Sequence, residues 1–429
     1  MATELARQMF RIITLTLPLI LLGGCVVEKR TEVKPGVTSA TNSTTGNEPL
    51  ARPVERQPAP TTTIHLLPLG TIPFNQATLP LVSPDGMFIA SETGLAPAIE
   101  TINASFRAIV PTATRVEVFA IAPPPLPSDS SSMIAKIGEL EAPMLLGRSA
   151  NNLGFIVEQP QQNGSRWIGF VEWKTGELTW IAQDTYVNAY AALGRSDSAD
   201  LVAWVRRRPD DAHFELVIRR GEVIETSLPP LDPAALEDAS VPLQTVEYLF
   251  PTWSDGGDGL FVFELHDDAT LNGVFLNGSN MGEMMLAPQR ITISKRGTRG
   301  MCFQMLAASP AMQGVPVPNR AQLIFFHPEY LAMAVWRPHL ASASRTKLLE
   351  KDSIAAAIDA NGFALYAVDN ELAGRPVDGR GQRVHITNEM YIPRLTDSKH
   401  WPFLLFSPIG SDPRMIVVGL AGVAVTPVQ

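Results

Sequence analysis

The chain repeats one short pattern along most of its length: a turn of polar or glycine residues leads directly into an apolar, strand-like run. Two copies share the tetrapeptide Leu-Gly-Arg-Ser, in LLGRSANNLGFIVE (145–158) and ALGRSDSADLVAWV (192–205). The pattern recurs less closely at 81–91, 251–265, 293–306, 356–368 and 394–407. Repetition of this kind predicts an architecture of similar units, in which each unit buries its apolar face against its neighbours.

The spacing of the repeats indicates what the unit is. One marker residue represents each turn: Ser83, Ser149, Ser196, Ser254, Gly297, Asp359 and Asp397. Successive markers are 66, 47, 58, 43, 62 and 38 residues apart, and further β-branched and aromatic runs, such as RWIGFVEW (166–173), lie between them. Three or four short strands in a unit of roughly 40 to 60 residues are typical of a β-propeller blade.

Composition favours the same all-β class. The 36 prolines and 31 glycines imply many turns. Only PAALEDAS (233–240) and SRTKLLEKDSIAAAI (344–358) have a tolerable helical pattern, and the second can equally form a strand with a loop. A β-sandwich would need fewer strands, and a parallel α/β fold would need helices of roughly 10 to 15 residues between its strands. The sequence therefore predicts an all-β β-propeller.

Seven markers predict seven blades. Six blades is the alternative, because the fifth marker, Gly297, stands in KRGTRG, a turn without Asp or Ser. We expect the ring to close by pairing TTTIHLLPLG (61–70) with the blade that contains RMIVVGLAGVAVTP (414–427), so that no sheet edge is left open. The proline- and serine-rich stretch IAPPPLPSDSSS (121–132) is predicted to be an insertion that lengthens the first interval.

One marker belongs to a fuller motif. Ser83-Pro84-Asp85-Gly86, followed by the apolar run MFIAS, resembles the blade turn of TolB-like, WD40-like propeller repeats in bacterial envelope proteins. Proline presets the backbone for a turn, and Asp-Gly supplies the chain reversal between two paired strands. The other markers keep only pieces of the motif, such as Ser254-Asp255-Gly256. The resemblance implies a propeller fold and a place in the cell envelope.

The N-terminal segment is predicted to be a signal peptide over residues 1–24. Arg7 and Arg11 flank the start of an apolar run that is too short to cross a bilayer as a helix. Leu22-Gly23-Gly24-Cys25 then resembles the lipobox of bacterial lipoproteins. That resemblance implies cleavage before Cys25 and acylation of Cys25 with several chains, of the palmitate type, which hold a protein stably on a lipid bilayer. The alternative is an ordinary signal peptide with an incidental cysteine.

The next segment is predicted to be a linker. Residues 25–63 are rich in Thr, Pro, Ser, Asn and Glu, so they offer little apolar surface to offset the entropy of ordering. The propeller is then expected over 64–429. Val26 stands where an Asp would signal retention in the inner membrane of enteric bacteria, which favours the outer membrane, facing the periplasm.

Motifs of common catalytic and metal sites are missing from the sequence. It contains no G-x-S-x-G, H-E-x-x-H, C-x-x-C or P-loop motif, and we predict no catalytic residue, no cofactor and no metal site. His266-Asp267-Asp268 and SDGGDG (254–259) are the best candidates for a cation, but turns explain both more simply. The tryptophans are interpreted as blade packing rather than a carbohydrate groove, and Cys302 as a buried free thiol.

Charge excludes one class of partner. The formal net charge of −9 argues against nucleic acid, and Arg206-Arg207-Arg208 runs into Asp210 and Asp211, as in a turn at the end of a strand. The remaining hypothesis is a binding or interaction module of the cell envelope for a protein or polymer ligand, tethered to the lipid bilayer by Cys25. The alternatives are a propeller-type hydrolase of glycans or lactones, with its site at the central channel, and a purely structural envelope lipoprotein.

Overall fold

The computed structural model describes residues 61–426 with interruptions. The omitted segments are 75–78, 95–113, 124–131, 195–199, 229–245, 267–269, 278–287, 295–314, 328–329, 342–344, 378–382 and 409–412, and the omitted single residues are 212, 319, 331, 360 and 369. The predicted signal peptide, Cys25, the predicted linker as far as residue 60, and Cys302 lie outside the described residues. One compact unit extends from Ile64 to Gly422.

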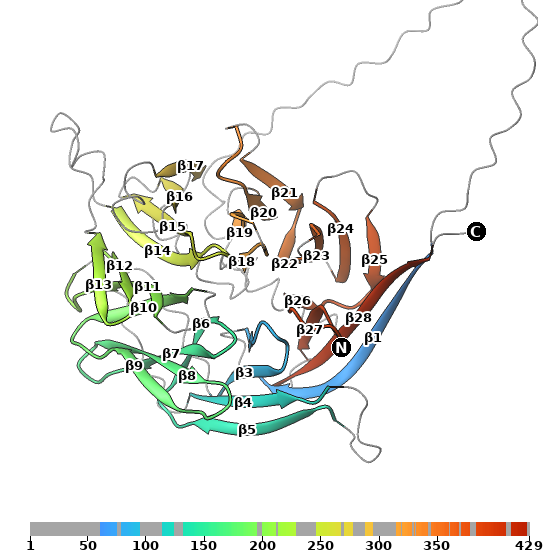
Figure 1. Cartoon of the computed structure of the whole chain (residues 1–429), viewed down its shortest axis with the longest axis horizontal. Helices are drawn as coiled ribbons and strands as arrows, with labels where there is room; N and C mark the ends of the chain where they lie inside the picture. Colours follow the sequence, from blue (N-terminus) through green and yellow to red (C-terminus); the bar gives the residue numbers. More distant parts are fainter. Residues whose placement is uncertain are drawn as a thin grey trace, which may run out of the picture. The chain divides into compact units, whose positions relative to one another are not determined.

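All regular structure in the described residues is β-strand (Figure 1). The first half comprises β1 (Thr61–Pro73), β2 (Leu81–Val82), β3 (Phe88–Thr93), β4 (Arg115–Ile121), β5 (Ile134–Leu140), β6 (Leu145–Ala150), β7 (Gly154–Pro160), β8 (Arg166–Glu172), β9 (Leu178–Ala182), β10 (Val187–Leu193), β11 (Leu201–Arg207), β12 (Glu215–Arg220), β13 (Val223–Leu228) and β14 (Val246–Trp253). The second half comprises β15 (Gly259–His266), β16 (Leu271–Asn277), β17 (Gln289–Ser294), β18 (Val315–Pro316), β19 (Leu323–His327), β20 (Ala332–Trp336), β21 (Thr346–Glu350), β22 (Ser353–Ile358), β23 (Phe363–Val368), β24 (Glu371–Pro376), β25 (Val384–Thr387), β26 (Ile392–Leu395), β27 (Phe403–Pro408) and β28 (Arg414–Thr426).

These strands form four-stranded units that succeed one another along the chain. Five sheets have four strands, and a sixth has eight. The eight-stranded sheet consists of two units, β6–β9 and β10–β13, joined by one parallel bridge between Arg166 and Val187. The described strands therefore make seven blades: β2–β5 (blade 1), β6–β9 (blade 2), β10–β13 (blade 3), β14–β17 (blade 4), β18–β21 (blade 5), β22–β25 (blade 6) and β26–β28 with β1 (blade 7).

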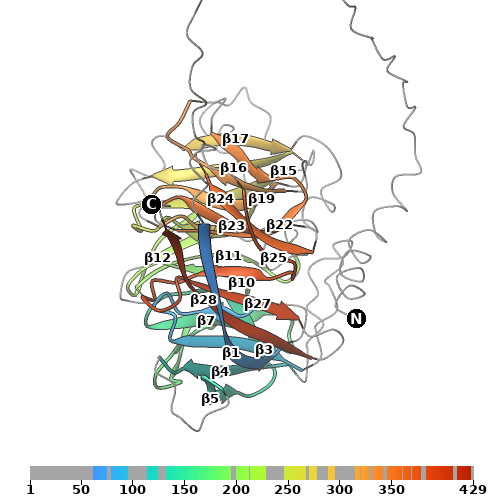
Figure 2. The ribbon, with the colours of Figure 1, turned by 90° about the vertical axis from the view of Figure 1, so that its right-hand side faces the viewer.

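The predicted ring closure is confirmed. Strand β1, from the start of the propeller, adds to the outside of blade 7, whose strand order is β1-β28-β27-β26. In Figure 1 the colours show that the blades of this compact unit follow one another around a common centre. Figure 2 shows β1 beside β28. A β-propeller with seven blades, the preferred prediction, is thus the fold of this chain.

Burial explains why the sequence forms blades. The second strands are covered on both faces by neighbouring blades, and all eight residues of β15 are buried. The outer strand β5 has no buried residue, so polar side chains are tolerated there. Trp173, Trp204, Trp336 and Trp401 are at most 2 % exposed, and therefore pack between strands as the sequence predicted.

Three details of the sequence interpretation are settled by the strands. The fifth marker, Gly297, lies outside the described residues, between β17 and β18; the corresponding turn of blade 5 is at residues 317–322, so the marker was misplaced although the blade exists. The ambiguous window 344–358 forms two strands, β21 and β22, around a left-handed turn at Asp352. The stretch 121–132 connects β4 to β5, within blade 1.

Candidate binding site at the centre of the ring

The Ser83–Gly86 motif forms a tight turn between β2 and β3. The Gly86 amide donates to the Ser83 carbonyl, and the Met87 amide donates to a carboxylate oxygen of Asp85. The Phe88 amide donates to the Ser83 hydroxyl oxygen at 2.9 Å. Gly86 has φ +71°, a conformation that side chains disfavour. The motif is therefore a chain reversal that is stabilised by its own residues, and local bonding or backbone geometry explains its residue types.

The same turn recurs in blade 4 with a changed sequence. The Gly257 amide donates to the Ser254 carbonyl, the Gly259 amide donates to the Ser254 hydroxyl oxygen, and Gly257 has φ +70°. The Ser254 hydroxyl donates to Asp258 at 2.7 Å. SDGGDG is accordingly a hairpin turn, as the simpler interpretation held. In structural register Gly257, and not Gly256, corresponds to the glycine of the full motif.

The first and last turns meet across the closure of the ring. The Asp397 amide donates to the Pro84 carbonyl oxygen, with 2.6 Å between the atoms. The Trp401 indole donates to the Gly86 carbonyl oxygen at 3.3 Å. We call these two contacts the seam. They show that the Ser83–Gly86 turn helps to hold blade 1 against blade 7, in addition to the pairing of β1 with β28.

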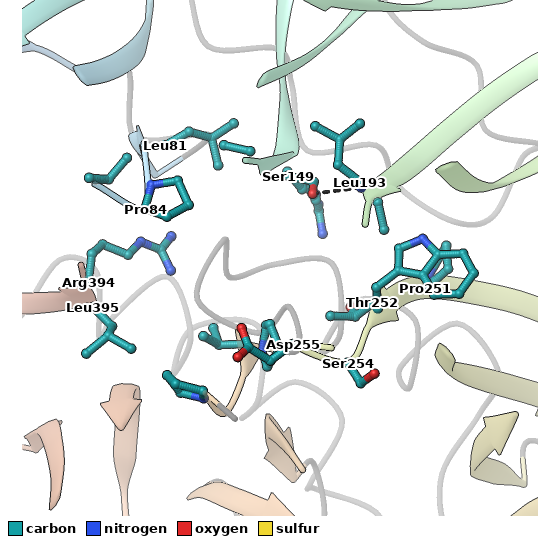
Figure 3. Close-up of a pocket in the computed structure, with 18 of the residues that line it drawn as sticks. Leu81, Pro84, Ser149, Leu193, Pro251, Thr252, Ser254, Asp255, Arg394 and Leu395 are labelled. Atoms are coloured by element: carbon teal, nitrogen blue, oxygen red, sulfur yellow. Dashed lines mark hydrogen bonds between the residues drawn. The ribbon is translucent and has the colours of Figure 1, made fainter. Parts of the chain in front are cut away.

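A cavity of about 230 Å³ lies where the innermost strands converge (Figure 3). Its walls come from the first strand of blades 1 to 5 and of blade 7, together with the turns that follow several of these strands. Apolar residues such as Leu81, Leu193 and Leu395 form much of the lining, and Asp255 and Asp397 contribute carboxylates. A concave, mainly apolar site with a few polar groups is what ligand-binding cavities usually offer.

One wall of the cavity is formed by Arg148, Tyr190 and Phe250, which come from blades 2, 3 and 4 and contact one another. The two rings are 4.4 Å apart, and the Arg148 guanidinium lies 4.9 Å from each ring centre. Both aromatic residues are in the left-handed region, with φ +56° at Tyr190 and +49° at Phe250. Each lies at a shift in the strand register. Tyr190 lies in the shift between Ala189 and Ala192, and Phe250 lies in the shift between Leu249 and Thr252. These bulges turn two bulky side chains in an unfavourable backbone conformation toward one cation.

Buried glutamates hold this wall in place from behind. Glu158, on β7, accepts a hydrogen bond from the Tyr190 amide at 3.0 Å, and its other oxygen pairs with Arg166 at 2.8 Å. Glu92, on β3, similarly accepts from the Leu146 amide of blade 2 at 2.8 Å. Each carboxylate thus fixes the innermost strand of the next blade. A charge-assisted bond to a backbone amide is stronger than a neutral one.

Arg394 extends from β26 into the cavity (Figure 3). Among the residues that the structure describes, its side chain has neither an ion-pair partner nor a hydrogen-bond partner. The surrounding protein lowers the pKa of its guanidinium to about 10, and desolvation by burial is the cause. Arg394 is still a cation at neutral pH.

The predicted candidates for a cation do not converge on a metal site. In the described part of the chain, no group of three or more His, Cys, Asp or Glu residues is arranged to hold a metal ion. His266 is buried at the end of β15 beside Asn272, at 2.9 Å, while Asp267 and Asp268 lie outside the described residues. Over the described ranges there is also no helix that is long and apolar enough to span a membrane.

The basic triplet also has a defined position. Arg207 is buried, ends β11 and donates to the Arg208 and Pro209 carbonyls, which confirms the turn at the end of a strand. Sequence reasoning missed Arg148, Tyr190, Phe250 and Arg394 as cavity residues. One available signal was a cation within a short, mainly apolar strand: Arg148 lies in β6 and Arg394 in β26.

No family model matches this sequence, and no curated protein sequence matches it. Solved structures are similar in fold. The β-propeller domain of Cps50 (Swd1) from Myceliophteria thermophila is 13% identical, with 83% of this chain and 99% of that chain covered and a TM-score of 0.46. The Dos1 propeller is 9% identical, with 82% and 95% covered and a TM-score of 0.45. Dipeptidyl peptidase 4 of Porphyromonas gingivalis is 10% identical, with 78% and 51% covered and a TM-score of 0.40. At these identities the likeness concerns the fold alone.

Proposed function

We propose that this chain is a binding module of the bacterial cell envelope, tethered to the bilayer through acylated Cys25, and that its ligand, part of a protein or a polymer, enters the central cavity. The lipobox Leu22-Gly23-Gly24-Cys25 supports the tether. The converging strands of six blades support the place of binding, because they bring side chains from distant parts of the sequence to one small cavity.

The observation that carries the proposal is the wall formed by Arg148, Tyr190 and Phe250. Left-handed backbone at non-glycine residues costs about 1–3 kcal/mol at each position, and such strain concentrates at functional sites. Here two such residues are neighbours, and both rings contact the same guanidinium in a cavity. A purely structural ring has no need of these two bulges, since an apolar pair in ordinary strand geometry would fill the space.

Binding at the cavity is tested by filling it. The full chain, purified in detergent, is immobilised and exposed to solubilised envelope proteins and to cell-wall fragments in separate experiments. We expect a component that the wild type retains and the Leu395→Trp variant does not, because Leu395 lines the cavity. Leu340→Trp is the matched control, since Leu340 is 41 % exposed and lies outside the lining. Equal retention by all three chains, or retention by none, contradicts the proposal and favours a structural role.

The tether has an independent test. Mass spectrometry of the N-terminal peptide should show a mature chain that begins at Cys25 and carries acyl chains. The Cys25→Ala variant should leave the membrane fraction, because the acyl chains supply the membrane affinity. An unmodified cysteine, or cleavage at another position, contradicts this part of the proposal.

A further inference from the structure

Arg394 is a cation in an environment that offers it little compensation. Within the described residues it has no acidic partner and no hydrogen-bond acceptor, although a guanidinium has five donors. An unpaired charge that is removed from water is unfavourable, and proteins normally pair or hydrate it. The side chain reaches into the cavity (Figure 3), so an anion that enters the cavity can meet it directly.

Arg148 contributes to the same cavity in a different way. Its guanidinium is held against the faces of Tyr190 and Phe250, at 4.9 Å from each. It adds positive potential to the wall, but the two rings hold it in place and it already has a further interaction within the protein. Arg394 is therefore the residue that is positioned to receive an anionic group of a ligand.

The remaining lining restricts the kind of anion. Asp255 and Asp397 place two carboxylates in the lining beside the two arginines, so the cavity has little net positive charge. A dianionic phosphate would meet these carboxylates, whereas a single negative charge suits one available guanidinium. The planar fork of arginine also matches a carboxylate in a bidentate pair.

Much of the lining of the cavity that Arg394 enters is apolar. Leu395 adjoins Arg394, and Leu81, Val82 and Val315 come from blades 1 and 5. A volume of about 230 Å³ is smaller than a drug-sized site, so it admits a small molecule or the last residue of a chain rather than a folded surface. We propose that the cavity binds a carboxylate attached to an apolar group, with Arg394 pairing with the carboxylate. This inference rests on the proposed binding function.

Two pairs of probes test the ligand chemistry on the full chain in detergent. The first is phenylacetate with its neutral analogue phenylacetamide, and the second is the peptide Ala-Leu-Phe with a free and with an amidated C-terminus. Calorimetry should show that each acid binds at least about 10-fold more tightly than its amide, since a charge-assisted hydrogen bond is lost in the amide. If the peptide acid binds more tightly than phenylacetate, the natural carboxylate is the C-terminus of a chain. If phenylacetate binds more tightly, the natural ligand is a small free acid.

Variants test the role of Arg394. Arg394→Gln should weaken phenylacetate binding at least about 10-fold, and Arg394→Lys should weaken it less, because charge without the bidentate fork remains. Arg208→Gln makes the same substitution at an exposed arginine outside the cavity and should leave affinity unchanged. Equal binding of acid and amide, or equal affinity in Arg394→Gln and Arg208→Gln, overturns the inference.

Failure of this inference is distinguishable from failure of the proposed function. If the Leu395→Trp variant loses an envelope component but the wild type binds acid and amide equally, the cavity is a binding site and the carboxylate assignment is wrong. If the acids bind through Arg394 but no envelope component is retained, the carboxylate site stands and the macromolecular ligand is wrong.

Discussion

The carboxylate of Glu158, in blade 2, accepts a hydrogen bond from the backbone amide of Tyr190, in blade 3, with 3.0 Å between the atoms. The same carboxylate pairs with Arg166, and both side chains are at most 7% exposed. One residue therefore supports the cavity wall and neutralises a buried cation.

Glu158→Gln should destabilise the protein by about 3 kcal/mol, because it removes the carboxylate that forms an ion pair with the buried Arg166. Glu139→Gln is the control, since Glu139 belongs to the exposed ion pair with Arg115 and should matter little. Denaturant unfolding of both variants gives the comparison. Equal midpoints would show that the inter-blade carboxylate has no special role.

Gly86 and Gly176 form a matched pair for testing the seam. Their φ angles are +71° and +70°, so alanine meets the same backbone strain at both positions, about 1 kcal/mol. A Cβ at Gly86 would also lie 3.0 Å from Ser398 Cβ and 3.2 Å from the Trp401 indole nitrogen, whereas Gly176 has nothing within 4 Å. Gly86→Ala should therefore cost about 3 kcal/mol in unfolding free energy, and Gly176→Ala about 1. If Gly176→Ala cost as much unfolding free energy as Gly86→Ala, the contacts of the seam would not explain the effect at Gly86.

Strand β1 should be required for the stability of the whole ring. A chain that begins at residue 71 lacks most of the strand that covers β28, so a sheet edge is exposed and each blade loses support from its neighbours. We expect a lower thermal midpoint than for a chain that begins at residue 60. Identical midpoints would mean that β1 closes nothing.

Arg394→Met should make the protein more stable while it removes carboxylate binding. Replacing an unpaired, partly desolvated cation by an apolar side chain of similar length should gain about 1–3 kcal/mol. Arg208→Met, at an exposed position, should change little. Chemical unfolding measures both variants. Destabilisation by Arg394→Met would mean that the guanidinium has a structural partner.

The depressed pKa of Arg394 gives a pH dependence. The folded state holds the pKa of this guanidinium at about 10, which is below its ordinary value in the unfolded state. The unfavourable contribution to stability is therefore complete below about pH 10. It is relieved as the pH rises further, because the unfolded state then binds more protons than the folded state. The affinity for phenylacetate should be constant between about pH 6 and about pH 8.5. It should fall as the pH approaches about 10.5, because Arg394 then loses its positive charge. Affinity that is constant throughout would contradict pairing with Arg394.

The fold was accessible from the sequence because its signals are local. The turn around Ser83, the turn around Ser254 and the apolar runs after them each specify a hairpin without help from distant residues. The number of blades could be predicted because the hairpins recur along the sequence. The identical tetrapeptides did mislead in detail: Leu146–Ser149 lies within β6, whereas Leu193 ends β10, so the two copies occupy different places in their blades. Gly297 misled because the turn of blade 5 has Val317 where the turns of blades 1, 4 and 6 have Ser or Asp, and Arg320 where they have Gly.

The cavity could not be predicted from the sequence in the same way. Left-handed backbone at Tyr190 and Phe250 arises from strand bulges that depend on neighbouring strands, and aromatic residues have no local preference for it. Arg148 and Arg394 come from blades 2 and 7, and only the arrangement of the ring brings them to one cavity. Charge within a short apolar strand was the one visible signal.

The place of β1 has a consequence for how the chain reaches its native state. Strand β1 is synthesised before the other strands of the propeller, yet its partner, β28, is made only after blades 1 to 6. Until then the first and last blades cannot meet, and the growing chain presents unpaired strand edges at both ends. Contacts between such distant segments form slowly, because a long loop must close first. The ring can therefore close only after β28 has been synthesised, and until then the unpaired strand edges are open to chaperones.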